Sequence, residues 1–414
     1  MTQTATTTDV PAIAGGKPAK TAPFGKERRY GDEELAELRE ALDQGSLFYA
    51  HGKKTAQLER AFAERVGARH AVACSSGTAA IHAALMAVGI SPGDEVITSP
   101  ITDAGSVLPI LWQGGVPVFA DLDPRTYNLD PASVATCVTP RTRAILAVHL
   151  AGNACDVRAL RAIGDRHKLV LIEDCAQAHG CTYEGKPVGT IGEVGCYSLN
   201  EFKHIACGDG GVVVTDDAAL AKRLRLATDK AYDRTPGALR REATFLAANY
   251  RITELQSAVA IAQLRKLDSI IARRRSWCGQ LSERLADVAG VQLPAATNGC
   301  VPSWWFYLMR VIPAELGTSA DEFAAALKAE GLPVGAHYIG RPVYAYPVLT
   351  DHSAFARGTH PSAAHDYRAT RCPTAEAILD TCVMLSVNEA YTDRDLDETA
   401  HAITRVAAWF RSRR

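Results

Sequence analysis

Three charged residues, Glu173, Asp174 and Lys203, stand at positions in the sequence that are typical of binding or catalytic sites. The two acids directly follow the four aliphatic residues 169–172, so at least one carboxylate should lie at the rim of a sheet, where ligands of parallel sheets collect. Asp174 could bind a cationic ring nitrogen, a metal or a ribose, or equally cap the next helix. Lys203 precedes the glycine-rich turn 208–211. It is either a solvated surface lysine or, if desolvated, a free amine able to form a Schiff base.

A third candidate is the small polar stretch Ser75-Ser76-Gly77-Thr78, which follows apolar residues and opens a helix. The free N–H groups and dipole of a helix N-terminus attract anions. Gly77 lets the backbone approach a ligand closely, and the Thr78 hydroxyl can add a hydrogen bond. The same residues also suit an ordinary helix N-cap. Neither a P-loop nor a dinucleotide glycine fingerprint is present, so a nucleotide P-loop is not supported.

Other catalytic motifs are missing from the sequence. It contains no H-E-x-x-H, no G-x-S-x-G and no histidine pair at metal-ligand spacing, so we predict no metal site. His149, His179 and His204 are isolated, and we expect them to be satisfied by hydrogen bonds. The aromatic residues 304–306 fit core packing better than a site.

Alternating apolar strands and helices must position these candidates. Strands are predicted at residues 71–74, 95–98, 116–120, 144–148, 169–172 and 212–215, with helices at 79–88, 103–112, 130–138 and 156–167. Strands that are apolar on both faces and separated by helices indicate a mainly parallel sheet covered on both sides. The fold class predicted is therefore α/β.

The flanking segments suggest how the rest of the chain is organised. A helix from Asp32 should bury Leu35, Leu38 and Leu42, and further helices are predicted from Thr55 to Val66 and from 253 to about 275. A strand at 304–312 and helices at 319–330 and 392–413 suit a smaller α+β domain. Residues 333–373 are irregular, which in a compact domain is typical of a segment that lines a site. We predict a loose N-terminal arm (1–29), a large α/β domain (30–262) and a small C-terminal α+β domain (263–414).

Composition excludes several classes of protein. The 414 residues carry 45 Lys+Arg against 46 Asp+Glu, a net charge of −1, so no field of one sign favours nucleic acid or an anionic membrane. The 11 cysteines form no C-x-x-C pair, which favours a reducing compartment. No secretory signal and no apolar run of ~18 residues is found. We expect a cytoplasmic protein.

Taken together and in order, these segments resemble the DegT/DnrJ family of pyridoxal-phosphate-dependent sugar aminotransferases. The resemblance covers most of the chain. Its motifs are Ser76-Gly77-Thr78-Ala79-Ala80, the stretches 89–97 and 117–121, Glu173-Asp174-Cys175-Ala176-Gln177-Ala178-His179-Gly180, the block from Ser198 through Lys203 to Gly211, Asn249-Tyr250-Arg251 and Cys372-Pro373-Thr374-Ala375-Glu376. It implies the fold type I architecture, in which the large domain has a mainly parallel seven-stranded sheet and binds pyridoxal 5'-phosphate.

The resemblance also implies residue roles. Lys203 would carry the cofactor as a Schiff base and later move a proton as general base. Asp174 would keep the pyridine nitrogen protonated, so that the ring can accept electrons. Gln177 would hydrogen-bond the ring's 3-oxygen. The phosphate would lie on the N–H groups of Gly77 and Thr78, beside the Ser198 hydroxyl.

The resemblance further implies a homodimer with a shared site, because the family asparagine that matches Asn249 reaches the phosphate of the neighbouring subunit. Two residues depart from the family pattern: Asp103 stands where an aromatic residue often stacks on the cofactor, and Leu199 stands where phenylalanine is common. The acid at 103 could change the acceptor pocket.

The candidates for the mouth of the substrate site are Arg251, His337, Tyr338 and Arg341. Packing between the two domains is an equally good interpretation of these four residues.

The implied reaction transfers an amino group from glutamate or glutamine to a nucleotide-linked keto sugar or a keto cyclitol. Residues 12–18 are similar to the start of some antibiotic-pathway members. Two alternatives stay open. One is a sugar dehydratase of the same family, which has histidine where this chain has Lys203. The other is a sugar-binding regulator without turnover, which the presence of Lys203, Asp174, Gln177 and Ser198 disfavours.

Overall fold

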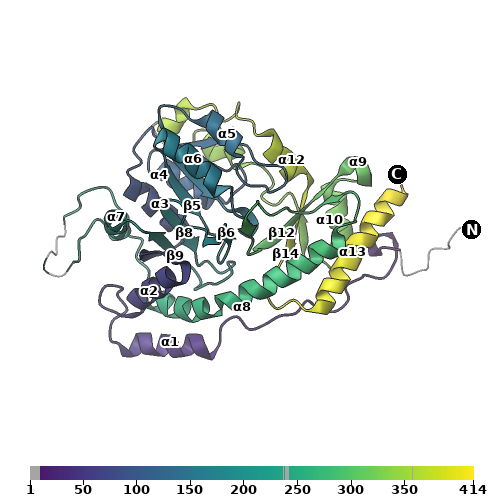
Figure 1. Ribbon diagram of the computed structural model, residues 1–414, viewed down its shortest axis with the longest axis horizontal. Helices are drawn as coiled ribbons and strands as arrows, with labels where there is room; N and C mark the ends of the chain where they lie inside the picture. Colours follow the sequence, from purple (N-terminus) through teal and green to yellow (C-terminus); the bar gives the residue numbers. More distant parts are fainter. Residues whose placement is uncertain (1–9, 236, 238–241, 357) are drawn as a thin grey trace, which may run out of the picture.

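A seven-stranded sheet forms the centre of the larger part of the molecule (Figure 1). The computed structural model describes residues 10–235, 237, 242–356 and 358–414. In the order β1-β9-β8-β5-β4-β2-β3, the strands are His70–Cys74, Gly211–Thr215, Val194–Ser198, Val170–Asp174, Thr142–Val148, Glu95–Thr98 and Val116–Phe119. Only β9 runs antiparallel to its two neighbours. The predicted α/β class with a mainly parallel sheet is confirmed.

Both faces of this sheet are buried, as the apolar strands predicted. In β4, Ile145 and Ala147 belong to the core on one face, whereas Ala144 and Leu146 belong to the core on the other. Alternate side chains of a strand point to opposite faces, so this division shows helices covering both sides. The helices of this part are α1 (Asp32–Asp43), α2 (Lys54–Val66), α3 (Gly77–Val88), α4 (Ala104–Trp112), α5 (Pro131–Cys137), α6 (Val157–His167) and α7 (Ala218–Thr228), with the 3-10 turn η2 (Leu150–Gly152).

A four-stranded antiparallel sheet forms the smaller part. Its order is β10 (Val291–Gln292), β12 (Phe306–Val311), β14 (Cys382–Ser386) and β13 (Val334–Ala336). The helices here are α9 (Pro313–Leu316), α10 (Ala320–Ala329) and α13 (Asp393–Ser412), with the 3-10 turn η1 (Ala12–Ala14). The later segments η3 (Val343–Ala345), α11 (Pro347–Thr350), η4 (Pro361–Ala364) and α12 (Pro373–Thr381) return to the larger part, where Val343, Leu349 and Ile378 join its core and η4 contacts β3. A third, three-stranded sheet joins β11 (Cys300–Val301), β6 (Thr182–Tyr183) and β7 (Lys186–Pro187).

Helix α8 (Glu254–Leu285) runs from the larger part to the smaller one (Figure 1). It is longer than the predicted helix, because no proline interrupts it and Gly279 is tolerated within it. The predicted domain division after residue 262 falls inside this continuous helix, and we keep the division as a proposal.

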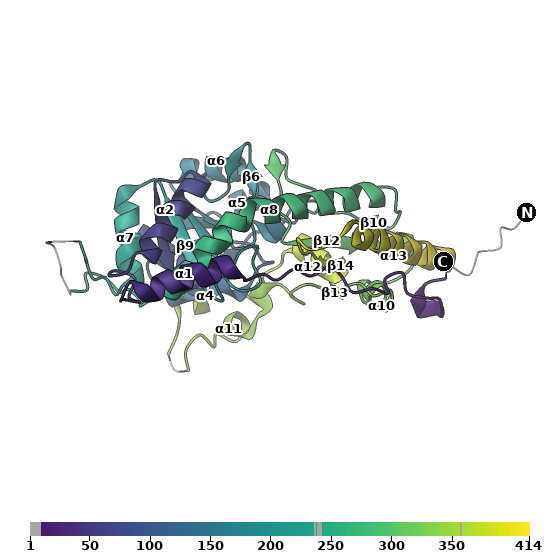
Figure 2. The ribbon, with the colours of Figure 1, turned by 90° about the horizontal axis from the view of Figure 1, so that it is seen from below.

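Helix α1 forms as predicted, but the predicted inward face is wrong. Leu35 and Leu42 are 54% and 61% exposed, whereas Glu34, Glu37 and Ala41 are buried. The reason is that α1 packs on a polar stretch of α8 (Figure 2), where Glu34 pairs with Lys266 and Glu37 pairs with Arg265. The apolar stripe of α1 therefore faces outward.

The N-terminal arm is less loose than predicted. Residues 1–9 lie outside the described residues. Beyond them, Lys20 is buried in ion pairs with Asp395 and Glu398, and Glu330 accepts the N–H groups of Ala12 and Ala19. These contacts fix the arm on the smaller part. Across the described residues, no helix is long and apolar enough to span a membrane.

Candidate active site

A cavity of about 330 Å³ lies at the carboxyl edge of the large sheet, where β5 and β8 end and α3 begins. It gathers six of the predicted site residues, namely Gly77, Thr78, Asp174, Gln177, Ser198 and Lys203, together with Asp103. Ser76, Ile81, Thr102, Gly105, Ser106, Ala176, Asn200 and Asp209 complete its lining. Segments that are more than a hundred residues apart in the sequence thus meet at the edge where ligands of parallel sheets bind.

Asp174 is the last residue of β5 and is only 3% exposed. Its Oδ2 accepts a 2.7 Å hydrogen bond from the Ser106 hydroxyl, and its Oδ1 accepts the N–H of Ala176 at 3.0 Å. Burial raises the pKa of Asp174, although these two hydrogen bonds act in the opposite direction. No ion pair joins it to Lys203. Asp174 is therefore a buried carboxylate that would be stabilised by a cationic ligand group in the cavity.

Lys203 lies in the turn after β8, with its Nζ 3.8 Å from the centre of the Trp305 ring. Burial lowers the pKa of Lys203, and the negative charges of Asp174 and Asp103 offset this only in part. A lysine in this setting is more readily deprotonated, and a free amine is the nucleophilic form. The solvated-surface alternative for Lys203 therefore does not fit its burial.

The turn that carries Lys203 is held from two distant segments. Arg29, from the arm, donates to the carbonyl oxygens of Glu201 and Lys203. The indole N–H of Trp305, from the start of the small sheet, donates to the carbonyl of Phe202 at 2.7 Å. Three consecutive carbonyl groups around the lysine are thus bonded by side chains, which restricts where the amine can lie.

The start of α3 offers the predicted anion seat. Ser76 is the N-cap residue, and its hydroxyl accepts the N–H of Ala79 at 3.0 Å. The N–H groups of Gly77 and Thr78 have no hydrogen-bond acceptor within the part of the chain that the structure describes. A Cβ on Gly77 would lie 2.6 Å from the Cβ of Ser198, so only glycine lets the helix start approach this strand end. The start of α3 can therefore be capped by Ser76 and still bind an anion through the N–H groups of Gly77 and Thr78.

Gln177 and Tyr338 meet at one side of the cavity. The Oε1 atom of Gln177 accepts the N–H of Ala151 at 2.8 Å, which leaves its amide nitrogen pointing the other way, 3.4 Å from the Tyr338 hydroxyl. One amide hydrogen of Gln177 stays available, since the NH₂ group carries two donors. Gln177 can therefore donate to an oxygen of a bound ring.

Together these groups fit the cofactor that the resemblance implies. A free amine, a buried carboxylate, an amide donor and a helix start match the aldehyde, ring nitrogen, ring oxygen and phosphate of pyridoxal phosphate. Gly77 and Gly105 also keep the cavity open, because a Cβ on Gly105 would lie 2.5 Å from the Thr78 hydroxyl oxygen.

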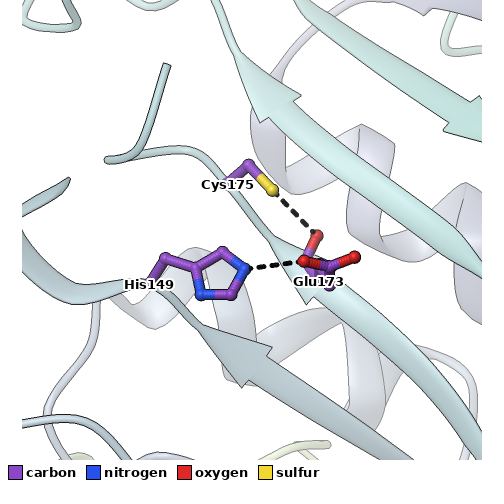
Figure 3. A group of neighbouring side chains, drawn as sticks. All are labelled: His149, Glu173 and Cys175. Carbon is purple, nitrogen blue, oxygen red and sulfur yellow. Dashed lines mark hydrogen bonds and ion pairs between the residues drawn. The ribbon is translucent and has the colours of Figure 1, made fainter. Parts of the chain in front are cut away.

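His149, Glu173 and Cys175 form a buried group beneath this edge of the sheet (Figure 3). Their ligand atoms could in principle hold a metal ion, but hydrogen bonds already engage them. Glu173 accepts His149 Nε2 at 3.0 Å and the N–H groups of residues 189, 191 and 192, while His149 Nδ1 accepts the N–H of Cys155. The group therefore ties the loop before β8 to β5, the strand that ends in Asp174.

The other two isolated histidines are also buried. His179 bonds to the Ser198 carbonyl at 2.7 Å, and burial lowers the pKa of His179 to about 4. His204 bonds to the Ser303 carbonyl, but its Nδ1 has no partner within the described residues. Hydrogen bonding thus satisfies His149 and His179 as expected, and His204 only on one side.

The predicted substrate residues are scattered around the cavity. Asp103 lines it from the N-cap position of α4, where its Oδ1 accepts the N–H of Gly105 at 2.7 Å. Tyr338 lies beside Gln177, with its ring against Phe306. Arg341 is exposed, with its guanidinium 5.8 Å from the Tyr346 ring.

Tyr338 and Arg341 are not among the residues that line the cavity, and neither are three further predicted residues. His337 bonds to the Leu379 carbonyl and to Asp321, and so points to a different surface. Arg251 pairs with the buried Asp229 at 2.6 Å. Asn249 is exposed and reaches no group of this cavity. For Asn249 this is the position expected if it serves a neighbouring subunit.

A larger cleft of about 710 Å³ adjoins this region and is lined by Trp305 and Tyr338, the residues that contact Lys203 and Gln177. Its charged residues are Arg28, Arg29, Lys266, Arg273 and Arg274 against Glu27, Glu201 and Glu389. Arg273 and Arg274 pair with Glu27 and Glu389. Arg29 bonds to backbone carbonyls, and Arg28 has no ion pair within the described residues. The cleft thus carries an excess of positive charge.

Ser106, Trp305 and Arg29 are the site residues that sequence reasoning missed. Ser106 lies one turn into a helix with no motif to mark it. Trp305 was expected to pack in the core, and it does pack partly there, but it also contacts Lys203. Trp305 directly precedes β12, about a hundred residues after Lys203, so no sequence spacing links it to the lysine.

Known proteins match this chain over nearly its whole length. The DegT/DnrJ/EryC1/StrS aminotransferase family model matches residues 28–404. The chain is 33% identical over 381 residues to the spore coat polysaccharide biosynthesis protein SpsC of Bacillus subtilis (strain 168), covering 90% of this chain and 94% of that protein. Among solved structures it is similar to 3-amino-5-hydroxybenzoic acid synthase, with 31% identity, a TM-score of 0.82 and coverage of 94% of this chain and 100% of that one. It is also similar to DesI, solved in the presence of its TDP-sugar product, with 31% identity, a TM-score of 0.81 and 97% of each chain covered.

Proposed function

Because this chain belongs to the DegT/DnrJ/EryC1/StrS aminotransferase family and is a pyridoxal-phosphate-dependent aminotransferase, we propose that it aminates a keto sugar linked to a nucleotide. The amino donor in this proposal is glutamate or glutamine. The observation that carries the proposal is the meeting of Lys203 and Asp174 in one cavity, with the start of α3 on its other side. A keto cyclitol is the second candidate acceptor.

In this proposal the residues of the cavity divide the binding of the cofactor among them. The amine of Lys203 would bind the aldehyde of the cofactor, and Asp174 would hold the protonated ring nitrogen. The N–H groups of Gly77 and Thr78 bind the phosphate with the Ser198 hydroxyl, and Gln177 donates to the ring oxygen. When bound, the cofactor supplies a ring that withdraws electrons from the substrate carbon. Lys203 would also serve as the general base that moves the proton at that carbon, a role that its lowered pKa supports.

The charge of the larger cleft supports a nucleotide-linked acceptor. A diphosphate carries negative charges that need cations, and Arg28 lines the cleft without an ion pair to any described residue. SpsC acts in polysaccharide biosynthesis by its name, and DesI was solved with a TDP-sugar product. These relatives favour the same class of acceptor.

Two observations favour the cyclitol as second candidate. Asp103 places an acid in the cavity, and a carboxylate binds the hydroxyl groups of an uncharged polyol well. The similarity to 3-amino-5-hydroxybenzoic acid synthase supports an acceptor that is a carbocycle without a nucleotide. The dehydratase alternative receives no support from the cavity, because the residue at position 203 is lysine and lines the cavity.

The test is a single-turnover experiment on the purified enzyme. The protein is first converted with ¹⁵N-glutamate or amide-¹⁵N glutamine, then mixed with nucleotide-linked keto hexoses or with free keto inositols. We expect a labelled amino sugar on the nucleotide. Labelled aminocyclitol alone would favour the second candidate, and accumulation of a keto deoxysugar would favour the dehydratase.

An arginine variant tests the location of the diphosphate. Arg28→Ala should raise the KM for the nucleotide-linked acceptor by roughly tenfold, as expected for the loss of one charge-assisted contact, and should leave the reaction with glutamate unchanged. Arg411→Ala, which removes an exposed arginine of α13, is the matched control. Equal KM values for the two variants would contradict a diphosphate subsite in the cleft.

A further inference from the structure

Cys181 and Cys300 have their Sγ atoms 3.6 Å apart, although 119 positions separate them in the sequence. Cys300 begins strand β11, and Cys181 directly precedes β6, the strand with which β11 pairs. All 11 cysteines are in the described part of the chain, and in no other pair are the two sulfur atoms in hydrogen-bonding contact. We propose that Cys181 and Cys300 are a thiol–disulfide modification site, which a peroxide closes and a dithiol reductant reopens.

The strand register places the two cysteines on the same face of one ladder. In the register of the two strands, Cys300 lies opposite Tyr183 and Val301 lies opposite Thr182. Cys181 and Cys300 are therefore diagonal neighbours on the same face of the ladder. A disulfide needs the sulfur atoms about 2.05 Å apart. The N–H of Cys181 bonds to the Ala178 carbonyl and its carbonyl accepts the N–H of Val188, so the two sulfur atoms must close the remaining distance by rotation of the side chains.

The surroundings favour Cys300 as the thiolate that reacts first. The contact from the Cys181 thiol lowers the pKa of Cys300, and the N–H of Ala154, 3.3 Å from its sulfur, and the guanidinium of Arg275 act in the same direction. Cys300 is also partly exposed, whereas Cys181 is 1% exposed. Reactive cysteines combine these two properties.

Arg275 also holds the two segments in place. Its guanidinium donates to the carbonyl of Gly180 at 2.7 Å, directly before Cys181, and to the carbonyl of Pro302 at 2.8 Å, two residues after Cys300. The Arg275 guanidinium, from α8, thus bonds to the backbone beside each of the two cysteines. It keeps the sulfur atoms in contact and places positive charge near them.

The reaction takes place in two balanced steps. The Cys300 thiolate attacks one oxygen of the peroxide, the O–O bond breaks and water or an alcohol leaves, so that the sulfur becomes a sulfenic acid. The Cys181 sulfur then attacks the sulfur of Cys300, the S–O bond breaks and water leaves with the thiol proton. The two sulfur atoms are oxidised by two electrons in total, and the peroxide is reduced by two.

The bond would join two segments that lead into the active site. Gln177 lies four residues before Cys181, and Trp305 lies five residues after Cys300. Between them, Ala151 accepts the N–H of Trp305 and donates to Gln177. A disulfide between Cys181 and Cys300 would therefore constrain the backbone that positions Gln177 and Trp305.

The experiment uses the full-length, cofactor-loaded enzyme treated with hydrogen peroxide, then alkylated and digested without reduction. We expect a peptide pair joined through Cys181 and Cys300 that has lost two hydrogen atoms, forming at least about tenfold faster than any other cysteine is modified. Dithiothreitol should separate the pair. Absence of this linked pair, or equally fast oxidation of Cys137, the other cysteine that is not fully buried, would overturn the proposal.

Two variants separate the roles of the cysteines. Cys181→Ser should leave Cys300 as a sulfenic acid that dimedone captures, because the second thiol is missing. Cys300→Ser should protect Cys181 from oxidation, while the control Cys137→Ser should form the disulfide at the normal rate. Oxidation of Cys181 in the absence of Cys300 would contradict the proposed order. If a variant fails to fold, the peptide analysis of the enzyme without substitutions still tests the proposal.

Discussion

Burial and nearby rings set the chemistry of Lys203. Its amine lies against the indole of Trp305, its pKa is lowered by burial, and Arg29 and Trp305 bond to the carbonyl groups of its turn. An amine that is both neutral and fixed in position can attack an aldehyde without first losing a proton to water.

Lys203→Ala should abolish turnover and the absorbance of lysine-bound cofactor after reconstitution. No other lysine lines the cavity, so we expect at least a 10³-fold loss of kcat. Absorbance titration with pyridoxal phosphate checks the first part, and an amino-product assay checks the second. Lys186→Ala, which removes an exposed lysine of β7, is the control and should behave as the unmodified enzyme. Retained absorbance in Lys203→Ala would remove the assignment.

The buried carboxylate of Asp174 should lower the stability of the cofactor-free protein, although the proposed reaction requires it. Burial raises the pKa of Asp174 above its ordinary value of 3.8, so the folded protein holds this proton more tightly than the unfolded chain does. The stability that protonation contributes is fully present below pH 3.8 and is lost as the pH rises through the raised pKa. At neutral pH the buried carboxylate is therefore destabilising while no cation is bound beside it.

Asp174→Asn should accordingly raise the Tm of the cofactor-free protein at pH 7 by roughly 1–2 °C, while lowering kcat by orders of magnitude. The Ser106 hydroxyl also bonds to Thr102, so it can turn to accept from the new amide. The gain in Tm should shrink toward pH 4, and it should reverse when pyridoxal phosphate is added. Asp209→Asn, at an exposed residue of the same cavity, should show none of these effects. A lower Tm for cofactor-free Asp174→Asn would contradict the argument.

Among the elements, α2 and α8 are joined at their N-termini by one carboxylate. Helix α2 has no side-chain cap of its own. Instead the fully buried Glu254, the first residue of α8, accepts the N–H groups of Lys54 and Thr55 at 2.7 and 3.0 Å. Its two oxygens also accept the Thr55 hydroxyl and the Gln44 amide. A negative charge at a helix start is favourable, so Glu254 serves as the cap of α2.

Glu254→Gln should lower the free energy of unfolding by about 2 kcal/mol, because the new NH₂ group faces N–H donors that the carboxylate oxygen accepted. Urea unfolding followed by circular dichroism measures this loss. Glu40→Gln is the matched control: its side chain is 68% exposed and pairs with Lys54, so less than about 1 kcal/mol should be lost. A similar loss in both variants would show that burial of Glu254 is not the cause.

Elements that carry a local signal could be predicted from the sequence, and elements that depend on neighbours could not. The apolar runs that form β2, β4 and β5 were identified directly. Strand β8 was missed because Gly195 and Ser198 interrupt its pattern, and pairing with β5 and β9 makes it a strand. The irregular segment 333–373 contains β13, which forms only by pairing with β14.

The candidate site shows the same division. The motifs around Gly77, Asp174 and Lys203 could be located because each is a local pattern at the end of a strand. The contacts of Ser106 and Trp305 could not, because they are made between segments with no common motif. The inward face assigned to α1 was wrong for a related reason: periodicity locates an apolar stripe but does not say which surface covers it.

For the whole molecule, that exposed stripe bears on the proposed homodimer. Leu35 and Leu42 lie on one face of α1 and are 54% and 61% exposed. Phe202, next to Lys203, is 77% exposed, and Leu246, three residues before Asn249, is 91% exposed. Exposed large apolar side chains mark candidate interaction surfaces. In the homodimer that the family resemblance implies, a second copy of this chain would cover these side chains and bring its Asn249 to the start of α3.

Leu35→Asp combined with Leu42→Asp should therefore give a monomer that binds the cofactor at least roughly tenfold more weakly, since two charges in an apolar interface cost several kcal/mol. Light scattering after gel filtration gives the mass, and fluorescence titration gives the affinity. Phe355→Asp, at another exposed aromatic residue, should leave both unchanged. Asn249→Ala should keep the dimer and lose only affinity for the phosphate. A fully active monomer, or an Asn249→Ala dimer with unchanged affinity, would show that each chain completes its own site.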